Sequence, residues 1–212
     1  MAKSNIPVGK GLSSSSVDIL GALISLNIYF DNPFHKKELY RLAATIDPTD
    51  ACISPPLTVI NQHRGEVIDV LPSLPYSLIW FDSEPEKQVN TVALTKNKKF
   101  TQQDYRLYNQ LFNGLRLAIM NSNYADFLFW ITQSSVYNER FLPKKNFNKL
   151  QEFAHLHSLG IFVAHSGTIM GLVMPSDKPE DEIASISLNF IKRNWDVNAH
   201  VECCQREGIS FS

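Results

Sequence analysis

The chain has 212 residues, of which 44% are hydrophobic and 19% charged, and its 20 basic and 21 acidic side chains give a formal net charge of -1. This length and composition suffice for one or two compact domains and exclude a disordered chain, a coiled coil and a collagen-like repeat. Because there is no basic excess and no apolar run long enough to span a bilayer, we expect neither a nucleic-acid nor a membrane partner.

The pattern of helices and strands is typical of a mixed α/β protein. The first half predicts helices followed by strands, at residues 13–29, 35–46, 57–61, 67–71 and 77–81. The second half predicts three helices, two short strands, a helix and a terminal strand, at residues 101–120, 124–141, 146–159, 161–164, 171–174, 179–195 and 197–203.

Two of these helices have strongly apolar surfaces. The helix at 13–29 is apolar on most faces, so we expect it to be central and buried. On the helix at 101–120 the aromatic stripe through Tyr105, Tyr108 and Phe112 predicts a core-facing side. The polar stretch 95–103, where strands give way to helices, is the expected domain boundary.

The cysteines are Cys52, Cys203 and Cys204. They form neither a disulfide framework nor a zinc-ribbon pattern, because two adjacent cysteines are not a normal chelating pair. No signal peptide precedes the first apolar run. We therefore expect free thiols and a cytoplasmic location.

The stretch that carries chemistry is residues 7–18, PVGKGLSSSSVD. A glycine turn leads here into a run of hydroxyl side chains at the start of a helix. Glycines let backbone N–H groups approach a phosphate, and a helix N-terminus adds unpaired donors. The serines could equally be ordinary helix caps. Lys10 either lies near the phosphate as a point charge or is solvated.

This stretch resembles the second motif of the GHMP small-molecule kinases (galactokinase, homoserine kinase, mevalonate kinase and relatives), a loop that wraps the triphosphate of ATP in that family. Two further blocks resemble its propanediol-utilisation L-threonine kinase branch, in the same order. Residues 47–50, DPTD, resemble an acidic Glu-Pro-Thr-Asp block, and residues 164–172, AHSGTIMGL, resemble a glycine-containing third motif. The similarity runs from about Ile6 to the C-terminal region.

The resemblance implies an α+β fold, a GHMP-kinase-like two-layer α/β sandwich that lacks most of the N-terminal half-domain and has a ferredoxin-like C-terminal part. It divides the chain into a partial ATP-binding domain at 1–95 and a C-terminal domain at 96–212. Family members carry a further segment upstream of the phosphate loop. We therefore expect association as a homodimer or with a partner chain that supplies the missing strands.

The resemblance also assigns residues. It implies a loop that holds the phosphates of ATP, made of Pro7, Gly9, Lys10, Gly11, Leu12, Ser13, Ser14, Ser15 and Ser16. Ser14 and Asp47 are the implied Mg²⁺ ligands, although Asp47 stands where the branch has Glu, and Glu38 is the alternative ligand. Asp50 either orients the acceptor hydroxyl as a general base or is a turn residue.

The third motif implies a substrate-binding turn, formed by His165, Ser166, Gly167 and Thr168. His165 either contacts substrate or stabilises the turn, and the second role is favoured. The function implied is ATP-dependent phosphorylation of the hydroxyl of a small amino acid, L-threonine in cobalamin-related metabolism. The alternative is a non-catalytic nucleotide-binding remnant or one chain of a split kinase.

Overall fold

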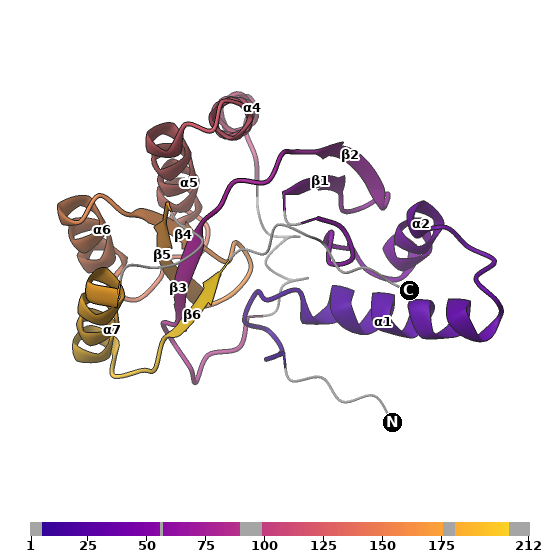
Figure 1. Ribbon diagram of the computed structural model, residues 1–212, viewed down its shortest axis with the longest axis horizontal. Coiled ribbons are helices and arrows are strands. Elements are labelled where there is room, and N and C mark those ends of the chain that lie inside the picture. The colour runs from indigo at the N-terminus through magenta and orange to yellow at the C-terminus, as the bar shows by residue number, and fades with distance from the viewer. Residues whose placement is uncertain (1–5, 56, 90–98, 176–180, 204–212) are drawn as a thin grey trace. The chain divides into compact units, whose positions relative to one another are not determined.

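The computed structural model describes residues 6–55, 57–89, 99–175 and 181–203 (Figure 1). Within them the chain divides into two compact units. Unit 1 comprises residues 6–8, 12–55 and 57–73, and unit 2 comprises residues 9–11, 74–89, 99–175 and 181–203. The division falls after Ser73, whereas the sequence predicted a boundary at 95–103, a stretch of which only 99–103 are described.

Unit 1 consists of two helices and a hairpin. Helix α1 (Ser14–Tyr29) and helix α2 (Lys36–Ile46) are followed by the antiparallel strands β1 (Thr58–Asn61) and β2 (Glu66–Val70). Their small core is built on the buried side chains of Leu20, Tyr40, Ala43 and Ile53. The Tyr40 hydroxyl donates to Ser54 Oγ (2.9 Å) and accepts from the N–H of Ile53 (3.1 Å), which fixes the segment after α2.

The prediction that the first helix is buried is wrong over most of its surface. Only Ser16, Leu20 and Asn27 are buried among the residues of α1. Apolar side chains near its C-terminal end are exposed, with Ile28 57% and Tyr29 76% accessible. A helix that is apolar on every face does not reveal from its sequence which faces are covered.

Unit 2 is built on a four-stranded antiparallel sheet. Its strands are β3 (Ser77–Asp82), β4 (Gly160–Val163), β5 (Ile169–Met174) and β6 (His200–Cys203), in the spatial order β4-β5-β3-β6. Helices α4 (Gln102–Met120), α5 (Tyr124–Asn138) and α6 (Phe147–Leu156) connect β3 to β4, and α7 (Asp181–Trp195) connects β5 to β6. This strand order with helical crossovers is the predicted ferredoxin-like arrangement.

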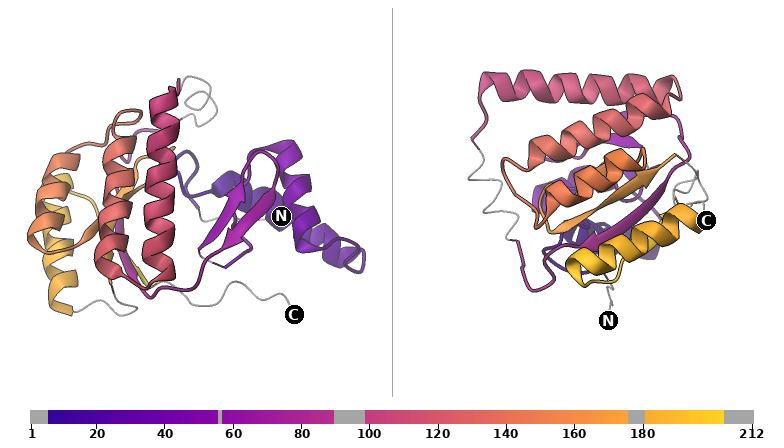
Figure 2. Two further views of the ribbon diagram at one scale, coloured as in Figure 1. Left: turned by 90° about the horizontal axis from the view of Figure 1, so that it is seen from above. Right: turned by 90° about the vertical axis from the view of Figure 1, so that its left-hand side faces the viewer.

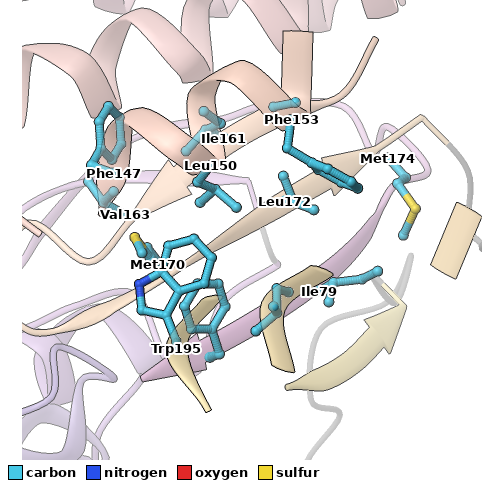
Figure 3. Packing of buried hydrophobic residues seen from close by; sticks show 13 residues of the cluster. Ile79, Phe147, Leu150, Phe153, Ile161, Val163, Met170, Leu172, Met174 and Trp195 are labelled. Atoms are coloured by element: carbon cyan, nitrogen blue, oxygen red, sulfur yellow. The ribbon is translucent and has the colours of Figure 1, made fainter. Parts of the chain in front are cut away.

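The main core of unit 2 lies between one face of the sheet and helices α6 and α7 (Figure 3). Residues Ile79, Met170 and Leu172 from the sheet meet Leu150 of α6 and Trp195 of α7 there. Figure 2 shows the helices of this unit arranged in one row along the sheet. The α+β class predicted from the sequence is therefore confirmed.

Helix α5 covers the edge of the sheet at β4. Ile161 donates its N–H to Thr132 Oγ1 (3.0 Å), and its carbonyl accepts from Ser135 Oγ (2.9 Å). These hydroxyls take the place of a neighbouring strand, so the edge is not left open to another chain.

The expectation that the aromatic stripe of α4 is core is only half right. Tyr108 is half-buried, but Tyr105 and Phe112 are 60% and 40% exposed. Helix α4 packs against α5, and its opposite side faces solvent.

The predicted helices and strands are present throughout the described residues, with ends that differ by at most three positions. The start of the helix predicted at 179–195 lies partly outside the described residues. Among the helices that the structure describes, none is both long and apolar enough to cross a bilayer. Cys52 and Cys203 are free thiols, as predicted, and Cys204 lies outside the described residues.

Candidate functional site

The start of α1 is the first part of the predicted site. Ser13 precedes the helix with a left-handed backbone (φ 58°), and its side chain makes no capping hydrogen bond. Its hydroxyl donates instead to Asp50 Oδ2 (2.5 Å). Because the first N–H groups of a helix have no partner within the helix, the amides at Ser14, Ser15 and Ser16 stay available for a ligand. The alternative that the serines are ordinary helix caps is therefore not met at Ser13, the residue that precedes the helix.

Asp50 is held from three sides within unit 1. Oδ2 accepts from Ser13, Oδ1 accepts from Gln62 Nε2, and the backbone N–H donates to Ser16 Oγ (3.0 Å). The Gln62 carbonyl also accepts from the N–H of Thr49 (3.0 Å). Asp50 thus connects the start of α1 to the end of β1, which is more than a turn residue requires.

Gln62 belongs to this cluster but carries no signal in the sequence. It follows a short strand and matches no motif, so its role comes from the hairpin that brings it to Asp50.

Cys52 lies next to this cluster in the chain. Burial, together with the negative charge of Asp50, raises the pKa of the Cys52 thiol to about 11. The side chain is therefore a neutral thiol at physiological pH.

Asp47 is the predicted metal ligand at the end of α2. Its extended backbone (φ −153°, ψ 148°) is the conformation favoured before a proline, here Pro48. Its Oδ2 accepts a hydrogen bond from Ser15 Oγ (2.6 Å). The structure therefore joins Asp47 to Ser15, whereas the sequence paired it with Ser14, a half-buried residue at the first position of α1.

Glu38, the alternative ligand, has a different task. Its Oε2 accepts from the N–H of His35 (2.7 Å), which closes the start of its own helix α2. The carboxylate is thus used as a helix cap.

A complete metal cage is not formed by protein groups in the described part of the chain, where no cluster of three or more His, Cys, Asp or Glu residues is arranged to hold an ion. Mg²⁺ rarely needs such a cage, because it keeps several waters and binds one or two carboxylates together with substrate phosphates. The half-exposed carboxylate of Asp47 beside the Ser15 hydroxyl fits that donor set.

Unit 2 holds the glycine turn. Gly9 and Gly11 have positive φ angles of 73° and 85°, a conformation that favours glycine. A Cβ on Gly11 would lie 2.5 Å from Ala164 Cβ, and one on Gly167 would collide with the carbonyl of Lys10. The turn at residues 164–168 therefore packs directly on the glycine turn.

Lys10 is buried, with 7% of its surface exposed. Its ammonium forms an ion pair with Asp82 Oδ2 (2.7 Å) and donates to the carbonyls of Glu84 (3.1 Å), Pro85 (2.7 Å) and Lys87 (2.7 Å). An ammonium has three donors, and all of them have acceptors here. The alternative that Lys10 is solvated is therefore wrong, and its place near a phosphate stays a prediction.

The charge of Lys10 also acts on its partner. Partial burial opposes ionisation of Asp82, but hydrogen bonds from Lys10 and from the backbone of Glu84, with the positive charge of Lys10, lower its pKa below the usual value. Asp82 is therefore a carboxylate at physiological pH, so the pair is a true ion pair.

The four predicted substrate-binding residues differ in accessibility. Gly167 and Thr168 are buried, and the Thr168 carbonyl accepts from both the N–H (3.1 Å) and the hydroxyl (2.7 Å) of Ser83. His165 is exposed, with Nε2 3.5 Å from Ser134 Oγ, and Ser166 is half-buried. His165 and Ser166 are thus the two residues of this turn whose side chains can meet a ligand.

Comparison with known proteins shows which proteins the chain is similar to. Residues 1–54 match the family model for the GHMP kinases N terminal domain. The chain is 26% identical over 200 residues to an L-threonine kinase of Salmonella typhimurium, which covers 91% of this chain and 66% of that protein. It is 29% identical over 202 residues to a homoserine kinase of Petrotoga mobilis, which covers 88% of this chain and 64% of that protein.

The chain is similar to the GHMP kinases in these comparisons. The crystal structure of homoserine kinase from Cytophaga hutchinsonii has the same fold, with a TM-score of 0.70 over 95% of this chain and 68% of that one at 16% identity. The present chain thus spans slightly less than two thirds of the length of the two sequence relatives named above.

Proposed function

We propose that the protein is an ATP-dependent kinase that phosphorylates the hydroxyl of a small amino acid, with L-threonine as the first acceptor. The observation that carries this proposal is the uncapped start of α1 directly after the glycine turn, where no acidic residue occupies the first helical turn. Such a start attracts an anion through its free amides and its positive dipole end. The similarity to an L-threonine kinase and to a homoserine kinase supports the acceptor class.

In this proposal the amides of residues 9–15 hold the phosphates of ATP. When bound, Mg²⁺ neutralises phosphate charge, and Asp47 with Ser15 are the residues that would hold it. Ser14 remains the second hydroxyl available at the start of the helix. Catalysis then comes from positioning and from charge stabilisation.

Asp50 serves the acceptor. The acceptor oxygen attacks the γ-phosphorus, the bond to the bridging oxygen breaks, ADP leaves, and Asp50 receives the hydroxyl proton. Each carboxylate oxygen has two acceptor positions. Asp50 can therefore accept this proton while Ser13 and Gln62 keep it oriented.

The direct test is a transfer assay with γ-labelled ATP, Mg²⁺ and either L-threonine or L-homoserine. We expect labelled phosphothreonine, and an Asp50→Asn variant that loses kcat about 100-fold or more. Glu66→Gln, at an exposed position of β2, is the control and should leave kcat unchanged. Labelled phosphohomoserine alone would correct the acceptor, and no product from either amino acid would contradict the proposal.

A second pair of variants tests the metal ligands. Ser15→Ala should raise the Mg²⁺ concentration needed for half-maximal rate more than Ser14→Ala does, because Ser15 is bonded to Asp47. If Ser14→Ala needs as much Mg²⁺ as Ser15→Ala, or more, Ser14 is the metal ligand as the sequence predicted.

In the non-catalytic alternative the protein binds ATP but does not transfer its phosphate. Titration calorimetry that detects ATP binding in a protein without transfer would favour a nucleotide-binding module or one chain of a split kinase. The exposed apolar end of α1, with Leu26, Ile28 and Tyr29, favours association with a second chain. Sedimentation velocity measures that association directly, and a monomer at all concentrations would argue against a self-assembled form.

A further inference from the structure

Lys10 occupies a position whose surroundings resemble those of a bound cation. Four oxygen atoms surround its Nζ at 2.7–3.1 Å, one from the Asp82 carboxylate and three from the backbone carbonyls of Glu84, Pro85 and Lys87. Carboxylate and carbonyl oxygens are the ligands of hard cations, and protein carbonyls also replace the hydration shell of K⁺.

We propose that Lys10 is a tethered cation that fills an oxygen cage at the end of β3 and thereby holds the glycine turn in the form that a phosphate requires. An ammonium is a compact point charge, comparable in its role to a bound monovalent ion, and the lysine stem attaches it to the turn itself. Lys10 is thus a positioning residue.

The cage is formed by one short segment. Residues 84–87 form a turn in which the Glu84 carbonyl accepts from both Lys10 Nζ (3.1 Å) and the N–H of Lys87 (3.0 Å). Three carbonyls that converge on one point repel each other, so a positive charge is needed between them. Lys10 supplies that charge, and the Asp82 carboxylate balances it.

The same segment also binds the backbone of the turn. The N–H of Val89 donates to the carbonyl of Gly9 (3.1 Å), and a Cβ on Gly9 would lie 3.4 Å from the Val89 carbonyl. On its other side, Lys10 contacts Gly167 through its own carbonyl. The ammonium therefore holds the segment that contacts Gly9, while the Lys10 carbonyl packs on Gly167 next to Gly11.

The first experiment replaces the tethered charge with a free one. Lys10→Ala leaves the cage without its cation, and we expect its thermal unfolding midpoint to fall by about 10 °C in tetramethylammonium chloride. Potassium or ammonium chloride at the same ionic strength should restore at least half of that loss, with saturation, because either ion fits four oxygens and binds only the folded state. Equal midpoints in all three salts would overturn the proposal.

Lys87→Met is the matched control. The Lys87 side chain is 43% exposed and pairs with Glu84 on the solvent side, while its carbonyl, which belongs to the cage, is unchanged by the substitution. We expect no specific response to potassium or ammonium in this variant. A specific response equal to that of Lys10→Ala would contradict the assignment.

The second experiment uses the unaltered protein, so it decides the matter even if Lys10→Ala fails to fold. Acetylation with an N-hydroxysuccinimide ester, read by peptide mass spectrometry, should label Lys10 at least tenfold more slowly than exposed Lys87 and Lys149. Adding ATP and Mg²⁺ should not change this protection. Rapid labelling of Lys10 in every condition would show a solvated lysine, and protection that appears only with ATP would show a phosphate ligand. Either result would overturn the proposal.

A third measurement rests on the proposed function. ATP affinity of Lys10→Ala should fall at least tenfold in tetramethylammonium chloride and recover in potassium chloride. If the unaltered protein itself does not bind ATP, the proposed function fails, while the unfolding and labelling results still decide the role of Lys10. If ATP binds and the variant keeps full affinity in every salt, the positioning role is wrong.

Discussion

The two units support neighbouring parts of one sequence motif by different means. In unit 1, serine hydroxyls are bound to the half-exposed carboxylates of Asp47 and Asp50 at the start of α1. In unit 2, the glycine turn is fixed by the buried ammonium of Lys10 and by backbone contact with Gly167. The sequence motif therefore has two parts. The serines at the start of α1 are polar and accessible, and the glycine turn at residues 9–11 is packed.

The cores of the two units also differ, in size and continuity. Unit 2 has a continuous core that runs from the sheet to α6 and α7, whereas unit 1 relies on a small cluster around Leu20 and Tyr40. A small core relaxes more easily around a cavity, and its helices leave apolar surface exposed. We infer that unit 2 is the rigid part of the molecule and that unit 1 adjusts more readily.

Matched cavities test this difference most strongly. Leu172 of β5 and Leu20 of α1 are both fully buried. We expect Leu172→Ala to lower the free energy of unfolding by about 4 kcal/mol and Leu20→Ala by about 2 kcal/mol. Urea denaturation, monitored by hydrogen exchange in each unit, measures the two losses of unfolding free energy. Equal losses would show that the two cores are equally tight.

Added volume at the turn tests the rigidity of unit 2. Gly167→Ala places a methyl group against the Lys10 carbonyl, so we expect a loss of about 3 kcal/mol in unfolding free energy. Gly21→Ala, on an exposed face of α1 with open space around it, should instead stabilise by up to about 1 kcal/mol. A Gly167→Ala variant as stable as the parent would mean that the turn yields easily.

The outer helices of unit 2 are joined by a buried carboxylate. Asp104 accepts from Tyr137 (2.5 Å) and pairs with Arg140 (2.9 Å). Hydrogen bonds, first from Tyr137 and then from Thr101, lower the pKa of Asp104 far below its usual value. This carboxylate therefore stabilises the fold above its unfolded pKa of about 3.9, and the stabilisation is lost as pH falls toward the folded pKa.

The thermal unfolding midpoints of the parent and of Asp104→Asn, compared across a pH series, measure this stabilisation. The midpoint of the parent should exceed that of the variant by a constant amount above about pH 5, and the difference should shrink below about pH 4. A difference that stays constant down to pH 2 would show that ionisation of Asp104 is not its source.

The last prediction changes no stability and concerns the thiol of Cys52 in unit 1. Because the pKa of Cys52 is raised to about 11 by burial and by Asp50, its thiolate is scarce at pH 8. In a Cys204→Ser background, iodoacetamide should modify Cys52 about 100-fold more slowly than an ordinary exposed thiol. If Cys52 of the folded protein reacted as fast as it does in urea, unit 1 would open readily around Asp50.

Local pattern was sufficient for the elements and for the motif. The periodicity of residues 13–29 indicated a helix, and the order of glycine turn, serines and acidic block predicted a site at its start, which stays a prediction. Exposure of α1 could not be predicted, because its apolar residues occupy every face. Contacts between distant residues were equally hidden, since nothing near Lys10 points to Asp82 and nothing near Gln62 points to Asp50.

The pairing of Asp47 with Ser15 also could not be predicted from the sequence. Four consecutive serines are equivalent by motif, and only the direction of each side chain around α1 decides which hydroxyl reaches the end of α2. The register of a helix against its neighbour is a tertiary property.

Backbone amide chemical shifts in the presence of a non-hydrolysable ATP analogue and Mg²⁺ test the central claim most directly. Phosphate binding at the start of α1 predicts that the amides of residues 9–16 shift together, saturably and more than any others, while those of β1 and β2 stay unchanged. Saturable shifts confined to another surface, with residues 9–16 unaffected, would contradict it.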